Sequence, residues 1–491
     1  MGCGAPSSEE DAGLSQTQLP LLMGPDFIVR EVSAPPSAFP NGPLPVTVTV
    51  CNQGTDAEST TVDVLLSEDG VLTPEDLPLY SQFLGWLQPG QCETNTFYTS
   101  ASVPSGARYV GAVADLFNGS AESNETNNAR TGPLVGIGYD ADIIIQEVSV
   151  PASASPWNVM TASVTVCNQG TVGGSAEVQL VLSEDTDIRF SWDGPPGEQD
   201  LPVFSFYSGP LDAGQCRKEQ LQFQVQPPHE GGWYLGAMAD PGNMTPELIE
   251  TNNTRASELF GIGIQADYII QTVSGPPSIA LGLPFTASVR VCNQGTVGGS
   301  TDVQLVLSQD TTIRFSYEGP PQDQDQPLTS FPTGHLEAGQ CRTHQVETSV
   351  HVSQEGPWYL GAVADPGHGE PELIETNNTL ASKTVGVGYG PDFIIESVIG
   401  PPSATPGWPL EVSVTVCNQG TDGGSTDVQL VLSEDTTIRF SYTEPPQGQD
   451  QPMTSFSTGW LGAGQCRTQQ VETSAQPYRY GAYYLGAVAD P

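Results

Sequence analysis

The chain has 491 residues, and 57 Asp plus Glu against 14 Lys plus Arg give it a formal net charge of -43 at pH 7. A surface of this sign repels nucleic acid and anionic lipid, which excludes binding to DNA, RNA or an anionic membrane surface. No segment approaches the roughly 20 apolar residues that span a bilayer, and the length predicts three or four domains.

Residues 1–24 are predicted to form a flexible tether, because they are rich in polar residues and show no hydrophobic period. Cys3 follows a small residue and precedes a polar stretch, which resembles the mature end of a bacterial lipoprotein. We therefore expect Cys3 to carry a lipid at the outer membrane. The alternative is an isolated cysteine near a disordered terminus. Eukaryotic myristoylation fits less well, because Pro6 occupies the position that requires Ser or Thr.

One cassette of about 120 residues occurs four times after the tether, a length typical of independent domains and longer than solenoid repeats. Each copy carries Cys-Asn-Gln-Gly-Thr and, farther along, Gly-Gln-Cys. We expect four domains, spanning residues 25–139, 140–264, 265–389 and 390–491.

Every copy is predicted to consist of β-strands. It opens with a short apolar segment such as Asp26-Phe27-Ile28-Val29, passes through a proline-rich turn, and then alternates apolar with polar residues, as in Val46–Val50. Such alternation indicates a strand with one buried face, whereas no segment shows a helical period. About seven short strands with Gly and Pro turns are typical of an immunoglobulin-like β-sandwich. A jelly roll or barrel would predict longer units without this placement of cysteines.

The joints between copies are short and apolar, as in Phe260-Gly261-Ile262-Gly263-Ile264. They differ from flexible Gly/Ser linkers, so the last strand of one domain is predicted to run almost directly into the next. The expected fold is therefore all-β, with tandem immunoglobulin-like domains in a rod.

Eight of the nine cysteines occupy the same two positions in each copy, which predicts one disulfide per domain. Because disulfides persist in oxidising compartments, the chain is expected to be secreted, periplasmic or on the cell surface. A zinc site would need clustered ligands, and the sequence contains no Cys-x-x-Cys. The predicted pairs are Cys51–Cys92, Cys167–Cys216, Cys292–Cys341 and Cys417–Cys466.

Strand parity predicts that these disulfides lie on the outer face of a sheet. Val48 and Val50 share the apolar face of their strand, so Cys51 points to the opposite, polar side. Cys216 has the parity of Gln220 and therefore also faces the polar side. The bond should join two strands of one sheet, unless a bulge separates Val50 from Cys51.

Copies two to four carry a longer loop than the first copy. Between the paired cysteines lie 48 residues in copy two but 40 in copy one. Insertions into a constant scaffold often carry binding functions, so these loops are candidate binding segments. They are marked by Ile-Arg-Phe-Ser and an aromatic residue at Ile188–Trp192, Ile313–Tyr317 and Ile438–Tyr442.

The repeated motifs are a Pro-Asp-aromatic-Ile-Ile opening, Val-x-Val-Cys-Asn-Gln-Gly-Thr, Leu-x-Leu-Ser-x-Asp, Leu-x-x-Gly-Gln and Tyr-Leu-Gly-Ala-Val-Ala-Asp, with a late motif at Asn124–Asn128 and Ile249–Asn253. Together they resemble the CARDB domain, the cell-adhesion-related domain found in bacteria. The resemblance covers residues 25–491 and implies an immunoglobulin-like sandwich on a bacterial surface. It is weak for function, because this extracellular module often stands beside unrelated catalytic domains. The regular cysteine pair is less typical of the family.

Two recurring acidic clusters are candidate calcium sites, because Ca²⁺ prefers carboxylate and amide oxygens on loops. The alternative is that these side chains cap turns through their own hydrogen bonds. No other cofactor is indicated. The first cluster comprises Asp240, Glu247 and Glu250 with Asn252 and Asn253, and Asp365, Glu372 and Glu375 in the next copy; the second comprises Asp185, Asp187 and Asp200.

The sequence lacks enzyme signatures such as Gly-x-Ser-x-Gly, a P-loop or His-Glu-x-x-His, so we expect no catalytic activity. Four of the five histidines lie in the third copy, which excludes a catalytic site shared by the repeats, and we expect them on the surface. The recurrent aromatic pairs Trp233-Tyr234 and Trp358-Tyr359 could be platforms for sugars, but core packing of a late strand explains them better.

The fourth copy stops at Pro491, where the earlier copies continue to a final strand. Either the sequence is a piece of a longer protein, or another chain donates the missing strand. We expect an adhesion or interaction rod on the bacterial surface, with an unknown protein or glycan as partner. The alternatives are a passive stalk for a domain beyond residue 491 and a self-associating filament subunit completed by strand donation.

Overall fold

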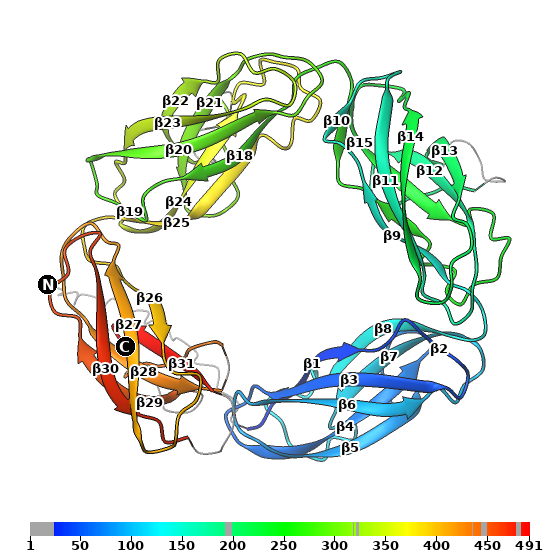
Figure 1. The fold of residues 1–491 in the computed structure, drawn as a ribbon, viewed down its shortest axis with the longest axis horizontal. Coiled ribbons are helices and arrows are strands. Elements are labelled where there is room, and N and C mark those ends of the chain that lie inside the picture. The colour runs from blue at the N-terminus through cyan, green and yellow to red at the C-terminus, as the bar shows by residue number, and fades with distance from the viewer. Residues whose placement is uncertain are drawn as a thin grey trace, which may run out of the picture. The chain divides into compact units, whose positions relative to one another are not determined.

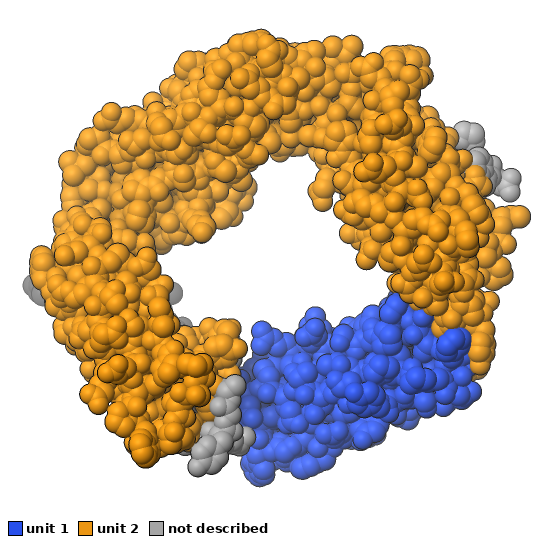
Figure 2. Space-filling view, in the orientation of Figure 1, with its two compact units in different colours: residues 1–103, 107–135 blue, residues 104–106, 136–491 orange. Residues whose placement is uncertain are grey.

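The computed structural model describes residues 24–191, 199–317, 319–320, 324–434, 436–442, 449–477 and 483–491. These residues form strands β1 to β31 and no helix, so no helix among them is long and apolar enough to span a membrane. The chain divides into two compact units, residues 1–103 with 107–135 and residues 104–106 with 136–491 (Figure 2). We call the sandwiches formed by β1–β8, β9–β17, β18–β25 and β26–β31 domains 1 to 4.

Domain 3 shows the architecture most clearly (Figure 1). One sheet has the strand order β18-β20-β23 and the other has the order β19-β25-β24-β21-β22. All pairings are antiparallel except that of β19 with β25. Its strands are β18 (Tyr268–Ser274), β19 (Ser278–Ile279), β20 (Pro284–Asn293), β21 (Asp302–Ser308), β22 (Gln326–Pro332), β23 (Cys341–Ser349), β24 (Gly356–Ala364) and β25 (Thr379–Val387).

Domains 1 and 2 repeat this pair of sheets, as β1-β3-β6 with β2-β8-β7-β4-β5 and as β14-β11-β9 with β10-β17-β15-β12-β13. In domain 1 the strands are β1 (Phe27–Ser33), β2 (Ser37–Ala38), β3 (Pro43–Asn52), β4 (Glu58–Ser67), β5 (Leu77–Leu87), β6 (Cys92–Ser100), β7 (Gly106–Ala114) and β8 (Ala129–Ile137). In domain 2 they are β9 (Ile143–Ser149), β10 (Ser153–Ala154), β11 (Val159–Asn168), β12 (Glu177–Ser183), β13 (Leu201–Tyr207), β14 (Cys216–Gln224), β15 (Gly231–Ala239), β16 (Thr254–Ala256), which also pairs with β15, and β17 (Phe260–Ile262).

Domain 4 has the sheets β26-β27-β30 and β29-β28-β31. Among the residues described there, no strand corresponds to β25 of domain 3, in keeping with the expectation for this copy. Its strands are β26 (Phe393–Ile399), β27 (Pro409–Asn418), β28 (Asp427–Ser433), β29 (Gln451–Ser457), β30 (Cys466–Ser474) and β31 (Tyr484–Ala489).

The alternating pattern of the sequence builds the cores. On β20, Ala287, Val289 and Val291 are fully buried, and the polar residues between them face outward. They pack against residues of the opposite sheet such as Leu305 and Ala362. Domains 2, 3 and 4 each have a core cluster of their own residues, which confirms the predicted all-β, tandem immunoglobulin-like fold.

The joint between domains 2 and 3, which lies within unit 2, is short and apolar. β17 ends at Ile262 and β18 begins at Tyr268. Leu373 is 2% exposed, and its side chain packs so closely that a Cβ atom on Gly261 would lie 2.6 Å from the Cβ of Leu373. Glycine at position 261 therefore permits close packing against Leu373. In domain 1 the position of Leu373 is occupied by the polar residue Ser123.

Candidate functional site

Each domain contains one disulfide between neighbouring strands of its three-stranded sheet. In domain 3, Cys292 on β20 lies opposite Cys341 on β23, with their Cα atoms 4.0 Å apart. In domain 1 the register runs unbroken from Val50 to Cys51 along β3 and β6, without the bulge that would have reversed the parity argument. The bonds are Cys51–Cys92, Cys167–Cys216, Cys292–Cys341 and Cys417–Cys466.

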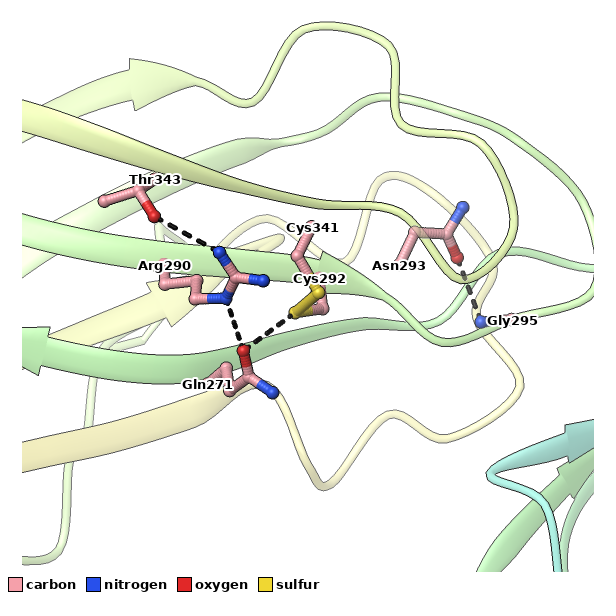
Figure 3. The surroundings of a disulfide bond; sticks show 7 residues. All are labelled: Gln271, Arg290, Cys292, Asn293, Gly295, Cys341 and Thr343. Carbon is pink, nitrogen blue, oxygen red and sulfur yellow. Dashed lines mark hydrogen bonds between the residues drawn. A yellow bond between two sulfur atoms is a disulfide. The ribbon is translucent and has the colours of Figure 1, made fainter.

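The polar side chains around the disulfide contact one another within the sheet. In domain 3 the Sγ atom of Cys292 lies 3.5 Å from Oε1 of Gln271, and Arg290 donates a hydrogen bond to the same oxygen (Figure 3). In domain 4, Glu396 lies beside Cys417 and Cys466, with ligand-type atoms within 4.8 Å of one another. Because those cysteines are oxidised, they offer no thiolate to a metal.

The asparagine after the first cysteine is fully buried and uses its entire hydrogen-bonding capacity. In domain 3, Oδ1 of Asn293 accepts hydrogen bonds from the backbone N–H groups of Asp267 and Gly295, at 3.1 and 3.0 Å. Its Nδ2 donates to the carbonyl oxygens of Val297 and Leu336, at 2.8 and 3.0 Å. One side chain thus joins the start of β18, its own loop and the segment before β23.

The rest of the Cys-Asn-Gln-Gly-Thr motif is also structural. Gln294 donates from Nε2 to Oδ2 of Asp267 at 3.1 Å, and Thr296 donates to the carbonyl oxygen of Gly263 at 2.7 Å. At Gly295 the chains approach so closely that a Cβ atom would lie 2.5 Å from the backbone of Ala266. The motif therefore fixes the end of each domain through contacts within the protein.

A buried cluster of carboxylates and amides lies directly beside this motif. In domain 3 it consists of Asp267, Glu372, Asn377 and Asn378, which we call the acid–amide cluster. Asn377 donates from Nδ2 to Oδ1 of Asp267 at 3.0 Å, and Asn378 donates to Oε2 of Glu372. Oε1 of Glu372 accepts the backbone N–H of Tyr268 at 3.2 Å. Asp267 is 0% exposed and Glu372 is 6% exposed, so both carboxylates are shielded from solvent.

Domains 1 and 2 contain the same cluster. In domain 2, Asn252 donates to Asp142 at 3.1 Å and Asn253 donates to Glu247 at 2.5 Å. Glu247 also accepts the backbone N–H of Ile143 at 3.0 Å. In domain 1 the corresponding residues are Asp26, Glu122, Asn127 and Asn128.

Burial dominates the protonation chemistry of the acid–amide cluster. It raises the pKa of Glu372 to about 8, and the pKa values of Glu122 and Glu247 to about 7. Hydrogen bonds from Asn378 and the backbone of Tyr268 oppose this shift, whereas the nearby carboxylates of Asp267 and Asp365 raise the pKa of Glu372 further. Burial also raises the pKa of Asp142 and of Asp267.

We expect domains 1 to 3 to lose stability as the pH rises when a chelator removes divalent cations. The pKa of Glu372 is about 8 in the folded domain against 4.5 as its ordinary value. Between these values Glu372 binds more protons in the folded state, so its contribution to the free energy of unfolding is greatest below pH 4.5 and decreases as the pH rises to 8. Calorimetry between pH about 5 and about 8 measures this slope.

The matched variants for this pH dependence are Glu372→Gln and Glu375→Gln. Glu375 is exposed and caps the turn by accepting the backbone N–H of Glu372, so its replacement should change the slope less than Glu372→Gln does. Glu372→Gln should flatten the slope for domain 3. Equal slopes in the two variants would contradict the role assigned to Glu372.

The structure separates the residues of the first predicted calcium cluster. Glu247, Asn252 and Asn253 belong to the acid–amide cluster of domain 2. Asp240 instead caps a turn by accepting the backbone N–H groups of Met244 and Thr245. Glu250 accepts the backbone N–H of Glu247. In domain 3, Asp365 and Glu375 likewise accept backbone N–H groups of their own turns. The sequence analysis missed Asp142 and Asp267 as site residues, although an Asp precedes the opening strand of every copy.

The carboxylates of the second predicted cluster have partners within their own loop. Asp200 accepts the backbone N–H of Arg189 at 2.7 Å, and Asp185 accepts that of Asp187 at 2.8 Å. The Arg189 guanidinium lies against the carboxylates of Asp185 and Asp187. These acids therefore shape the loop through hydrogen bonds to its backbone, as the turn-capping alternative predicts, and Arg189 offsets part of their charge.

The longer loops of domains 2 and 3 are anchored on the scaffold. Ile313 is 8% exposed and packs against Val306 and Val363, and Ile188 is 6% exposed. An open groove in domain 3 is lined by Asp310, Arg314 and Trp358, among others. Trp192 of the equivalent loop in domain 2 lies outside the described residues.

The aromatic and histidine residues named from the sequence have different environments. Trp233 and Trp358 are buried, at 3% and 8% exposure, which confirms that they pack in the core. Of the four histidines expected on the surface, His335, His351 and His368 are exposed, whereas His344 is half-buried against Phe331. Burial lowers the pKa of His344.

The CARDB family model matches residues 24–132 and 140–257, which fall in domains 1 and 2. Among solved structures, one similar to this chain is the CARDB domain of the PF1109 protein from Pyrococcus furiosus, described as a complex with di-metal ions. The two sequences are 24% identical, and the match covers 24% of this chain and 96% of that chain, with a TM-score of 0.20. Its solution structure is 25% identical, with coverages of 24% and 97% and a TM-score of 0.20. Activated Escherichia coli α2-macroglobulin is 11% identical, with coverages of 95% and 44% and a TM-score of 0.23. No curated protein matches.

The matched segments contain the motifs whose contacts are described above: the opening Asp, the Cys-Asn-Gln-Gly-Thr loop and the late Asn-Asn pair. An extracellular type of domain with a disulfide in every copy indicates a secreted or cell-surface location. The chain carries the CARDB domain in tandem, over residues 24–132 and 140–257.

Proposed function

We propose that this CARDB protein is an adhesion or interaction protein of the bacterial surface, and that domain 1 contacts the partner. The observation that carries the proposal is an exposed aromatic pair on β5. Phe83 is 67% exposed and Trp86 is 64% exposed. Large aromatic side chains at such exposure are typical of surfaces that bind proteins or sugars.

The two rings lie on the same outer face of the sheet. Phe83 pairs with Thr61 and Trp86 pairs with Ser59, two residues apart on β4. Residues at this spacing point to the same side of a strand, while the intervening Thr60 is buried. We call Phe83 and Trp86 the β5 aromatic pair.

Among the described residues, only domain 1 has an aromatic side chain at both of these positions. Tyr207 and Pro210 occupy these positions in domain 2, and Pro332 and His335 occupy them in domain 3. Domain 4 has Ser457 with Trp460, which is 68% exposed. The sequence signal was Phe-Leu-Gly-Trp-Leu, where apolar residues fall on both faces of an edge strand.

We expect Phe83→Ser with Trp86→Ser to weaken partner binding at least about tenfold, because exposed aromatic anchors carry a large share of binding energy. Binding of the labelled full chain would be measured on a printed glycan array and on immobilised collagen, fibronectin and laminin. Tyr98→Ser is the control, because Tyr98 is 84% exposed but lies on β6 of the other sheet.

Unchanged binding of the double variant, or equal losses with Tyr98→Ser, would contradict the assignment to β5. Absence of binding by the unmodified chain would favour the passive stalk. A lipid on Cys3, which lies outside the described residues, would anchor the protein at the outer membrane, and the intact mass of the membrane-extracted protein would test it.

A further inference from the structure

The acid–amide cluster of domain 3 contains two buried oxygen atoms that have no partner. The amide nitrogens of Asn377 and Asn378 donate to Asp267 and Glu372, so both amides are turned into the cluster. Their Oδ1 atoms are buried and accept no hydrogen bond, and Asn378 is only 4% exposed. A buried acceptor left unpaired costs free energy, so a partner is needed at this position.

Reversing the amides does not remove the deficit. Rotation of either side chain by half a turn would place Oδ1 against the carboxylate oxygen that now accepts from Nδ2, which is unfavourable when that carboxylate is ionised. In the structure both nitrogens donate to Asp267 and Glu372, which accept these hydrogen bonds when ionised. The unpaired atoms are therefore the oxygens.

The same deficit recurs in each domain that has the late Asn-Asn pair. Asn127, Asn128, Asn252 and Asn253 also have buried Oδ1 atoms without a partner, and Asn128 and Asn253 are 5% and 6% exposed. Domains 1 to 3 thus each present two unpaired amide oxygens beside two carboxylates. A recurrence in three separately folded sites indicates a common ligand rather than a local packing defect.

The charge of the cluster specifies the sign of that ligand. Asp267 and Glu372 are both buried, and the charged neighbours that act on Glu372 are further carboxylates, Asp267 and Asp365. Buried carboxylates require a compensating cation, or they lose their charge. A cation would satisfy the carboxylates and the unpaired oxygens at once.

We propose that Asp267, Glu372, Asn377 and Asn378 bind a divalent cation of the hard, oxygen-preferring class, and that the equivalent residues of domains 1 and 2 do the same. Carboxylate and amide oxygens without His or Cys favour Ca²⁺ over Zn²⁺ or Cu²⁺. Two carboxylates match the charge of one such ion. The net charge of -43 raises the local concentration of cations around the chain.

The test is equilibrium dialysis of the full, chelator-stripped chain against ⁴⁵Ca²⁺ in the presence of KCl. One ion should bind in each of domains 1 to 3. Glu372→Gln, which keeps the size of the side chain, should remove one of these ions and leave the other two. The two remaining sites report that the rest of the chain is folded. The triple variant with Glu122→Gln, Glu247→Gln and Glu372→Gln should bind no stoichiometric Ca²⁺.

The matched control is Glu125→Gln, Glu250→Gln and Glu375→Gln, which removes the same charge from exposed carboxylates in the same loops. This control should retain full stoichiometric binding. Equal losses in the two triple variants would show diffuse binding to an acidic surface and would overturn the proposal. Absence of Ca²⁺ binding to the unmodified chain would overturn it as well. We expect Mg²⁺ to displace bound ⁴⁵Ca²⁺ less effectively than unlabelled Ca²⁺ does.

Discussion

Replacement of Cys292 and Cys341 together by alanine is expected to lower the free energy of unfolding of domain 3 by about 4 kcal/mol. The disulfide closes a segment with a sequence separation of 49, and its loss returns conformational entropy to the unfolded chain. The folded sheet keeps its register, because eight further residue pairs join β20 to β23. The effect thus acts mainly through the unfolded state.

Calorimetry of the full chain would measure this change as a lower transition temperature for one domain. The transitions of domains 2 and 4 should stay in place, because each has a core of its own residues. Ser288→Ala with Gln345→Ala is the matched control, since these residues form a hydrogen-bonded pair on the same two strands at 3.0 Å. A loss in the control as large as that in the cysteine variant would refute the chain-entropy explanation.

Asn293→Ala is expected to destabilise domain 3 by about 3 kcal/mol or more, although it removes only one small side chain. The substitution leaves two backbone N–H groups and two carbonyl oxygens without their buried partner. Unpaired buried groups cost roughly 1–3 kcal/mol each, and partial access of water reduces the sum. Denaturant unfolding of the full chain would show the loss.

Gln294→Ala provides the comparison for Asn293→Ala. Gln294 makes one side-chain hydrogen bond, to Asp267, and its replacement should cost about 1 kcal/mol. Both residues lie in the same loop, so a general sensitivity of that loop would affect them equally. Similar losses in the two variants would show that the buried network around Asn293 has no special role.

The two sets of repeated polar residues therefore have different tasks. The Cys-Asn-Gln-Gly-Thr loop has its hydrogen bonds satisfied within the protein, as Asn293 shows. The late Asn-Asn pair does not, as the unpaired Oδ1 atoms of Asn377 and Asn378 show. Repetition within the chain marks both sets equally, and only the hydrogen-bond pattern separates a structural motif from a candidate site.

The β-sandwich fold and the disulfides could be predicted from local patterns. A period of two on β20 determines which residues enter the core, because side chains alternate between the faces of a strand. The same alternation turns the side chain of Cys292 to the face opposite that of Val291. The fixed spacing of the cysteines in each copy indicates which two form the disulfide. These inferences need no knowledge of which distant strands become neighbours.

The acid–amide cluster and the β5 aromatic pair could not be predicted in this way. Asp267 and Asn377 are 110 residues apart, and Asp240 and Glu250 were grouped with Glu247 only because they are close in sequence.

Short-range spacing and composition are sufficient to predict the repeat, the strand periodicity, the sulfur pairing and a secreted or cell-surface location. Three-dimensional contacts are needed to show which carboxylates are buried together, which amide oxygens are unpaired and which aromatic rings are exposed on β5 at the edge of its sheet. Burial and hydrogen bonding depend on contacts between segments far apart in the chain, and sequence spacing does not encode these contacts.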